Sequence, residues 1–246
     1  MKKNILYFIV GFIVISSIGL VAYEDFKKNN KETATKVEQE KIIKKSELSD
    51  MGLDEKQLEP VKKVKEIQTN EHLLGEAGAP IKIIVYSDFA SAYSEKYYRN
   101  LIKTKEEFKD KIVIAFRNFP LVKINPNSFS AALVAECAGE QGKYLEMNKI
   151  LWDNSKNNEL GIEQYKKDAA DLKLDETKFS QCLVSEKYKN KIDTEIAEAG
   201  TYNVNGAPTT FVNDEIVIGA NPYEDTVSSD GREIEGLKSI IERQLK

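Results

Sequence analysis

The sequence contains few of the side chains that usually carry enzyme chemistry. Its 246 residues include one histidine, His72, and two cysteines, Cys137 and Cys182. These are too few ligands for a His/Cys zinc site or for a haem held by histidine and a second residue. We therefore expect no metal and no cofactor. The remaining reactive groups are carboxylates, hydroxyls and two thiols. Among them, Ser91 and Ser94 stand three residues apart, shortly after the apolar run at residues 81–86.

Charge and composition limit the partners. Lys and Arg number 36 and Asp and Glu number 40, which gives a formal net charge of -4. Such a chain lacks the basic surface that binds nucleic acid. Hydrophobic residues make up 41% and charged residues 31% of the sequence, a balance typical of a globular protein. We expect a folded body that binds no nucleic acid.

The N-terminal residues predict a membrane anchor. Residues 5–23 carry no charge and, as a helix of roughly 28 Å, would cross a bilayer core. The run ends without a small-x-small cleavage site, which favours an uncleaved signal anchor at 1–23 over a cleaved signal peptide. Lys2 and Lys3 favour a cytoplasmic N-terminus. Residues 24–70 predict a charged, solvated linker, so residues 71–246 are expected to lie outside the cytoplasm on a single-pass protein of the cell membrane.

The elements around Ser91 form a strand–helix–strand pattern. Residues 81–86 are a β-branched run that predicts a buried strand, residues 91–108 have helical spacing, and residues 111–117 predict a second strand. This unit builds a parallel sheet with a right-handed crossover. It places Ser91 where the first strand passes into the helix, a position at which serine is a good N-cap.

A helical block and a hairpin follow. Helical patterns cover about 125–200, interrupted by glycines near residue 140. Residues 209–218 predict a β-hairpin, because Asn213-Asp214 tolerate the backbone of a tight turn. Residues 232–246 predict a final helix. The predicted class is α/β with an inserted helical block.

Four segments resemble DsbA-like thiol–disulfide oxidoreductases. In that family a strand ending in Asp-Phe runs into Cys-x-x-Cys at a helix start, and a later loop carries a cis-proline. The resemblance covers roughly residue 72 to the C-terminus, in the family's order, through SDFASAYS at 87–94, FRNFPL at 116–121, AECAGEQGK at 135–143 and GAPTTFVN at 206–213. It implies a thioredoxin fold with a helical insertion, which agrees with the predicted element order.

The family's catalytic sulfur has no counterpart. Ser91 and Ser94 occupy the positions of the two cysteines, with Ala92 between them. Disulfide exchange needs a thiolate nucleophile and a thiol leaving group, so hydroxyls cannot perform it. Asn125 and Ala207 replace a histidine and a threonine that are common in the family. Several changes around one site favour a naturally lost redox centre over deliberate replacement of cysteine by serine.

Two other enzymatic roles remain for Ser91. A hydrolytic nucleophile needs a neighbouring base, but the sole histidine is His72 and no Gly-x-Ser-x-Gly surrounds Ser91. The segment also resembles kappa-class glutathione transferases, in which a serine hydroxyl binds the glutathione thiolate. The predicted anchor disfavours that mainly cytoplasmic class.

Cys137 and Cys182 lie on apolar helix faces. They are either two buried free thiols or a disulfide, and an extracytoplasmic location favours the disulfide. Some members of the family have a structural disulfide in the helical block. A catalytic role is not expected, because neither cysteine follows a strand at a helix start.

The segment Ala207-Pro208 matches the family's cis-proline loop, whose main chain binds extended peptide. That recognition needs no cysteine. The alternative is a rigid loop that serves folding alone. Tyr93 is expected either to line the same groove or to join the core. Asp88 is expected to be a surface or capping acid, and a partly buried carboxylate with a shifted pKa is the alternative.

We therefore expect non-covalent binding of unfolded or extended polypeptide near Ser91, Ser94, Tyr93 and Ala207-Pro208, in a chaperone-like or assembly role. One alternative is a thiol–disulfide oxidoreductase whose catalytic cysteines were replaced by Ser91 and Ser94. A second is a glutathione-binding, transferase-like enzyme that uses a serine hydroxyl.

Overall fold

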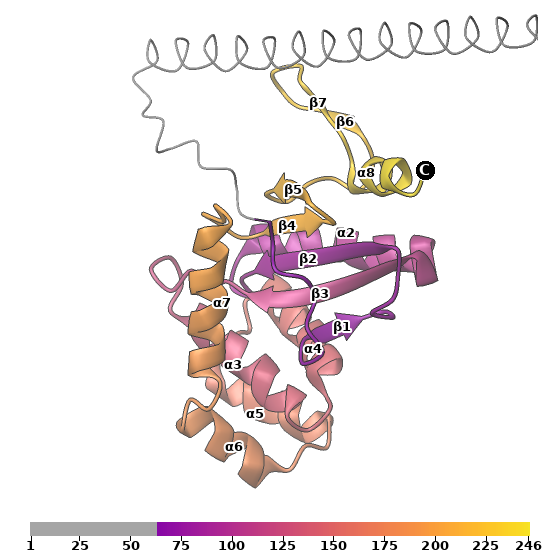
Figure 1. Ribbon diagram of the computed structural model, residues 1–246. Helices are drawn as coiled ribbons and strands as arrows, with labels where there is room; N and C mark the ends of the chain where they lie inside the picture. Colours follow the sequence, from indigo (N-terminus) through magenta and orange to yellow (C-terminus); the bar gives the residue numbers. More distant parts are fainter. Residues whose placement is uncertain (1–62) are drawn as a thin grey trace, which may run out of the picture. The chain divides into compact units, whose positions relative to one another are not determined.

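The computed structural model describes residues 63–246 (Figure 1). The predicted anchor at 1–23 and most of the predicted linker lie outside these residues. Within 63–246, no helix combines the length and the apolar composition that crossing a bilayer requires.

A five-stranded mixed sheet with the strand order β1-β3-β2-β4-β5 forms the centre of the fold (Figure 1). β2 and β3 are parallel, and the other neighbouring pairs are antiparallel. The helix α2 (Ala92–Phe108) joins β2 to β3, as the strand–helix–strand pattern predicts. The strands of the sheet are β1 (His72–Leu74), β2 (Ile81–Ser87), β3 (Ile112–Asn118), β4 (Thr209–Val212) and β5 (Glu215–Ile218).

The helical insertion lies between β3 and β4, and most of it lies below the sheet in the view of Figure 1. Its chain turns at Gly142, whose φ of 73° favours glycine, so the first long helical stretch is divided as predicted. The fold class predicted from the sequence, an α/β thioredoxin-like domain with a helical insertion, is confirmed. The inserted helices are α3 (Asn127–Gly139), α4 (Tyr144–Asn157), α5 (Ile162–Asp171), α6 (Glu176–Val184) and α7 (Lys189–Thr201).

Each face of the sheet has its own apolar core, because β2 and β3 are buried on both sides. On one face Ile83 and Val85 of β2 pack with α2, α4 and α8 (Leu237–Gln244). On the other face Ile84 and Tyr86 pack with the end of α7 and with Val64. The sheet therefore holds the end of β2, and with it the start of α2, between two packed layers.

The C-terminal region differs from the prediction. The helix expected from residue 232 begins only at Leu237, and the preceding residues form the hairpin β6 (Thr226–Val227) and β7 (Glu233–Ile234), which projects from the body (Figure 1). Gly236 explains the late start of the helix. A Cβ at Gly236 would lie 2.4 Å from the Glu224 carbonyl carbon. The main chains of these two residues, which flank the hairpin, therefore pack directly against each other.

The packed body extends N-terminal to residue 71. Val64 is buried against the sheet. The buried Arg117 of β3 donates to both carboxylate oxygens of Glu71, at 3.0 and 2.9 Å, and to the Lys65 carbonyl at 2.8 Å. Arg117 also donates to the Tyr86 hydroxyl, whose pKa burial raises to about 12. These bonds fasten the chain that enters β1 across one face of the sheet.

A buried polar cluster joins the insertion to the end of β3. Asn118 donates through its side chain to Glu136 of α3 at 2.9 Å and to Glu195 of α7 at 2.8 Å. Lys191 bridges the same two carboxylates, and His72 of β1 hydrogen-bonds Glu136 at 2.9 Å. Burial raises the pKa of Glu195, while hydrogen bonds and charge from His72 and Lys191 outweigh burial and lower that of Glu136. The cluster thus joins β1, β3, α3 and α7 through hydrogen bonds.

Candidate functional site

Ser91 and Ser94 both lie at the start of α2. Ser91 is the N-cap, with φ -98° and ψ 119°, and its Oγ accepts the Ser94 N–H at 3.3 Å. Ser94 is buried, and its Oγ accepts the Asp88 N–H at 3.4 Å. The N-cap predicted at Ser91 is therefore confirmed. Because Ser91 Oγ acts as an acceptor towards the helix, its own proton stays free to donate to a ligand.

Asp88 is buried directly behind this helix start. Its Oδ1 accepts the Ala90 N–H at 2.9 Å, and its Oδ2 accepts the Leu121 N–H at 3.0 Å and the Ser128 hydroxyl at 2.9 Å. Burial raises the pKa of the Asp88 carboxyl, and the three donors offset part of that rise. Asp88 is thus the buried carboxylate of the two alternatives, and it ties the loop after β3 and the start of α3 to the start of α2.

The loop before β4 lies at the same edge of the sheet. The peptide bond between Ala207 and Pro208 is cis, as the family resemblance implies. β4 runs antiparallel to β2 with Thr209 opposite Tyr86, so Pro208 continues the register alongside the last residue of β2. The chain leaves β2 at Ser87 and reaches Ser91 four residues later. The fold therefore places the start of α2, which carries Ser91 and Ser94, and the proline loop at the same end of β2 and β4.

Exposed apolar side chains accompany the helix start. Tyr93 is 73% exposed, which places it outside the core. Val122 and Ile124 are 50% and 79% exposed in the loop that Leu121 anchors to Asp88. Sequence reasoning missed these two residues, although their alternation with lysine and asparagine in LVKIN is a signal of outward apolar side chains. Tyr93 thus exposes apolar area at the start of α2, and Val122 and Ile124 expose it on the loop that hydrogen-bonds to Asp88.

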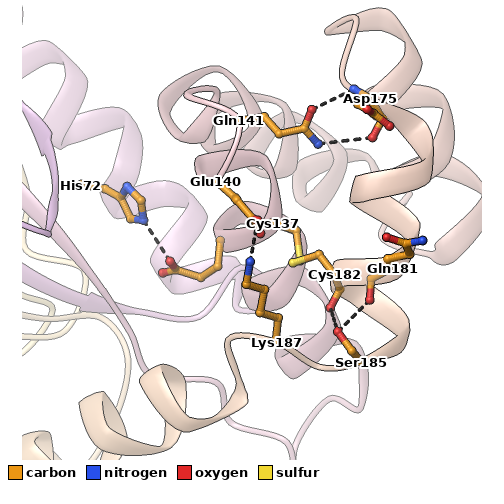
Figure 2. The surroundings of a disulfide bond; sticks show 10 residues. His72, Cys137, Glu140, Gln141, Asp175, Gln181, Cys182, Ser185 and Lys187 are labelled. Carbon is orange, nitrogen blue, oxygen red and sulfur yellow. Dashed lines mark hydrogen bonds and ion pairs between the residues drawn. A yellow bond between two sulfur atoms is a disulfide. The ribbon is translucent and has the colours of Figure 1, made fainter.

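The two cysteines lie elsewhere. Cys137 of α3 and Cys182 of α6 form a disulfide with Cα atoms 5.8 Å apart, so the favoured pairing is confirmed. Figure 2 shows that the bond is surrounded by contacts within the insertion: Lys187 with Glu140, and Gln141 with Asp175 in both directions. Both cysteines are buried, and residues 63–246 contain no free thiol. The disulfide links two inserted helices and contributes nothing to the helix start of α2.

Metal binding finds no support in this part of the chain. Across residues 63–246, no three His, Cys, Asp or Glu side chains group closely enough to hold a metal ion. The acids of the helix start are Asp88, which three protein donors engage, and Glu95, which pairs with Arg99 at 2.7 Å. What the arrangement offers chemically is hydroxyl and amide hydrogen bonding beside apolar surface.

Comparison with known families identifies the fold. The Thioredoxin_4 family, described as thioredoxin, matches residues 67–229. The chain belongs to this family. The matched range includes the start of α2, the insertion with its disulfide and the cis-proline loop. The predicted membership of the DsbA-like, thioredoxin-fold family is therefore confirmed.

Solved structures place this thioredoxin-family protein among DsbA-like folds. BdbD of Bacillus subtilis has a TM-score of 0.61 at 15% identity, with 76% of this chain and 99% of that chain covered. Alpha-DsbA1 of Wolbachia pipientis has a TM-score of 0.56 at 23% identity, with 72% and 92% covered. DsbA2 of Pseudomonas aeruginosa has a TM-score of 0.52 at 18% identity, with 72% and 94% covered. These similarities describe the fold.

Curated relatives of this thioredoxin-family protein include much longer transporters. The Na(+)/H(+) antiporter NhaA 1 of Mycolicibacterium vanbaalenii is 27% identical over 143 residues, which are 58% of this chain and 23% of that protein. NhaA 3 of Salinispora tropica is 30% identical over 146 residues, 58% of this chain and 22% of that protein. The chain spans less than a quarter of the length of these relatives, and no transport activity follows from the match.

Proposed function

We propose that the protein is a redox-inactive, DsbA-like thioredoxin-fold protein that binds unfolded or extended polypeptide without forming a covalent bond. The observation that carries this proposal is the presence of hydroxyls at both reactive positions of a helix start whose supporting geometry is intact. Ser91 caps α2, Asp88 retains three donors, and Ala207-Pro208 lies at the same sheet edge. A site without a thiolate can bind but cannot exchange disulfides.

Contacts available at this site suit an extended polypeptide. Main-chain groups before Pro208 would hydrogen-bond the client backbone in a β-like manner. Tyr93, Val122 and Ile124 would contact apolar client side chains, because they expose large hydrophobic area. The Ser91 hydroxyl would donate to a client carbonyl. No charged side chain is required, so sequence preference would be weak and directed to apolar segments.

The proposed binding is tested with a fluorescent, permanently reduced unfolded client. Fluorescence anisotropy should detect binding by the native protein and about a tenfold weaker affinity, ~1.4 kcal/mol, for Tyr93→Ser combined with Ile124→Ser. Val184→Ser is the matched control, because Val184 is 87% exposed but lies at the end of α6, outside the site. Equal binding by all three proteins, or no binding by the native protein, contradicts the proposal.

The same preparation separates the alternatives. A glutathione-binding site would give heat on titration with millimolar glutathione, and Ser91→Ala would abolish it. Exchange activity of the unaltered protein on a disulfide-bonded client would instead support an oxidoreductase. We expect neither signal.

Membrane anchoring belongs to the same proposal. It rests on the uncharged run at 5–23 and on the two lysines before it. We expect the full chain to remain in the membrane pellet after alkaline carbonate extraction. External protease should reach the thioredoxin domain in intact cells from which the wall has been removed. Release by carbonate, or protection from protease, contradicts the anchored, extracytoplasmic arrangement.

A further inference from the structure

The loop entering β4 contains the chain's single Asn-Gly pair, Asn205-Gly206. It lies between the end of α7 at Thr201 and the cis peptide bond before Pro208. Asn205 is exposed. Among residues 63–246, no protein group hydrogen-bonds its side-chain amide, and none accepts the Gly206 N–H. An exposed amide and a free backbone nitrogen are thus adjacent in the loop that borders the candidate site.

We propose that Asn205-Gly206 is a site of spontaneous covalent modification that regulates the binding loop. The Gly206 backbone nitrogen attacks Cγ of Asn205. The new N–Cγ bond forms as the Cγ–Nδ2 bond breaks, and the amide leaves as ammonia, taking up the proton of the Gly206 N–H. Water then opens the resulting succinimide to aspartate or isoaspartate. The net reaction consumes one water and releases one ammonia, and no electrons are transferred.

Three features of the loop favour this reaction. Asparagine is among the chemically labile residues of proteins. Glycine leaves the attacking nitrogen unshielded because it has no Cβ, and even a Cβ built at Gly206 would meet no atom within 4 Å. The pair lies outside helices and strands, so no regular hydrogen bond must break before the ring closes.

Other asparagines of the domain lack one of these features. Asn125 and Asn221 precede proline, which has no N–H to act as nucleophile. Asn213 is held on both sides of its amide, since it accepts the Lys82 N–H at 2.9 Å and donates to Gln244 at 2.7 Å. Asn203 is exposed in the same loop, but the next residue is the buried, β-branched Val204. Asn203 is therefore the natural internal control.

Conversion would change the candidate site in two ways. A neutral amide becomes a carboxylate, and the isoaspartate form adds a methylene to the main chain between Asn205 and Gly206. That methylene shifts the backbone just before Ala207, where the proposed function places the client's hydrogen bonds. This consequence rests on the proposed function, whereas the modification itself does not. We expect the converted protein to bind client about tenfold more weakly, equivalent to ~1.4 kcal/mol.

The chemical step is tested by ageing the purified full chain at mildly alkaline pH and mapping its peptides by mass spectrometry with fragmentation. Asn205 should gain the mass of an amide-to-acid conversion at least tenfold faster than Asn203, a barrier difference of ~1.4 kcal/mol. Gly206→Ala should slow the conversion by a similar factor. The structure leaves room for this change, and circular dichroism confirms the fold of the variant. Equal rates at Asn203 and Asn205, or an unchanged rate in Gly206→Ala, overturn the proposal.

The regulatory step is tested separately with Asn205→Asp and with aged native protein, using the anisotropy assay. Reduced affinity in both, with full affinity in aged Gly206→Ala, supports regulation. Unchanged affinity in Asn205→Asp and in the aged protein overturns regulation even where the mass change occurs. If fresh native protein binds no client, the proposed function fails, while the mass measurement still decides whether the loop is modified.

Discussion

The helical insertion and the start of α2 differ in their sulfur content. In the insertion, Cys137 and Cys182 form a buried disulfide between α3 and α6. At the start of α2, where the helix amides would favour a thiolate, the partly exposed Ser91 and the buried Ser94 stand instead. The first position uses the covalent bond, and the second would have used the reactivity of a thiolate.

The difference separates the two roles that a cysteine sulfur can have, which are structural and chemical. A buried disulfide stabilises by restricting the unfolded chain and needs no accessible sulfur atom. A reactive cysteine needs a lowered pKa and an approach path, both of which the start of α2 supplies. At the start of α2 the hydrogen-bonded support is therefore present without sulfur, and the proposed function assigns the remaining contacts to binding.

The largest effect is expected when cysteines replace the two serines at the start of α2. We expect the double variant Ser91→Cys, Ser94→Cys to form a disulfide and to oxidise a reduced dithiol peptide, whereas the native protein gives no rate above buffer. The helix start should lower the pKa of the first thiol, because its amides and dipole favour the anion. Peptide oxidation followed by mass spectrometry measures the effect.

Single variants at Ser91 or Ser94 are the controls, because one thiol can form a mixed disulfide but cannot resolve it. Oxidation by the unaltered protein at the rate of the double variant would show that the native site is itself redox-active.

Removing the Cys137–Cys182 disulfide tests whether sulfur has a structural role in the insertion. The disulfide closes a sequence separation of 45 residues, for which the chain-entropy relation gives ~4 kcal/mol. We expect Cys137→Ala with Cys182→Ala to lower the free energy of unfolding in urea by about 2–5 kcal/mol. Client binding at low temperature should persist, because the bond lies outside the site.

The neighbouring Lys187→Gln is the matched control. It removes an exposed ion pair with Glu140 (Figure 2) and should change the free energy of unfolding far less than loss of the disulfide, because solvent screens the pair. A loss in the double alanine variant no larger than that of the control would mean that the bond contributes little stability.

A smaller effect is expected from Asp88, the buried acid behind the start of α2, on the pH dependence of stability. Burial raises the folded-state pKa of Asp88 above that of the unfolded chain. The proton that the folded state binds more tightly therefore adds stability that is fully present below the unfolded pKa and is lost as pH rises through the folded pKa. We expect the stability difference between native protein and Asp88→Asn to favour the native protein most in acid and to decline towards neutral pH.

Urea unfolding across that pH range measures this difference. Asp110→Asn, at an exposed acid of the turn after α2, is the matched control. A difference between native protein and Asp88→Asn that does not vary with pH would show that Asp88 ionises equally in both states.

Sequence patterns predicted the elements near the site because those patterns are local. The β-branched run of β2, the N-cap at Ser91 and the turn at Asn213, which has φ 51°, depend on residues within a few positions of each other. The final helix was predicted too long because the apolar spacing continues through Ile234, which in the fold pairs with Thr226 in a hairpin.

Contacts between distant segments were beyond such patterns. Asp88 became a buried carboxylate only because Ser128, 40 residues away, donates to it. His72 reaches Glu136 across 64 residues, and it fits because Gly139 has no Cβ, which would lie 2.8 Å from the imidazole. The loop that carries Val122 and Ile124 is anchored by the Leu121 N–H, which donates to Asp88 across 33 residues.

By itself, the sequence determined which atoms are available: two thiols in the insertion and hydroxyls at the start of α2. The order of β2, α2, β3, the inserted helices, β4, β5 and α8 also followed from it, because backbone conformation responds to neighbouring side chains, whereas β1 and the β6–β7 hairpin were not predicted. Tertiary structure alone decided which polar groups are buried, which apolar groups face solvent and which loops share a sheet edge. These properties depend on residues that are far apart in the chain and meet only when both faces of the sheet are covered.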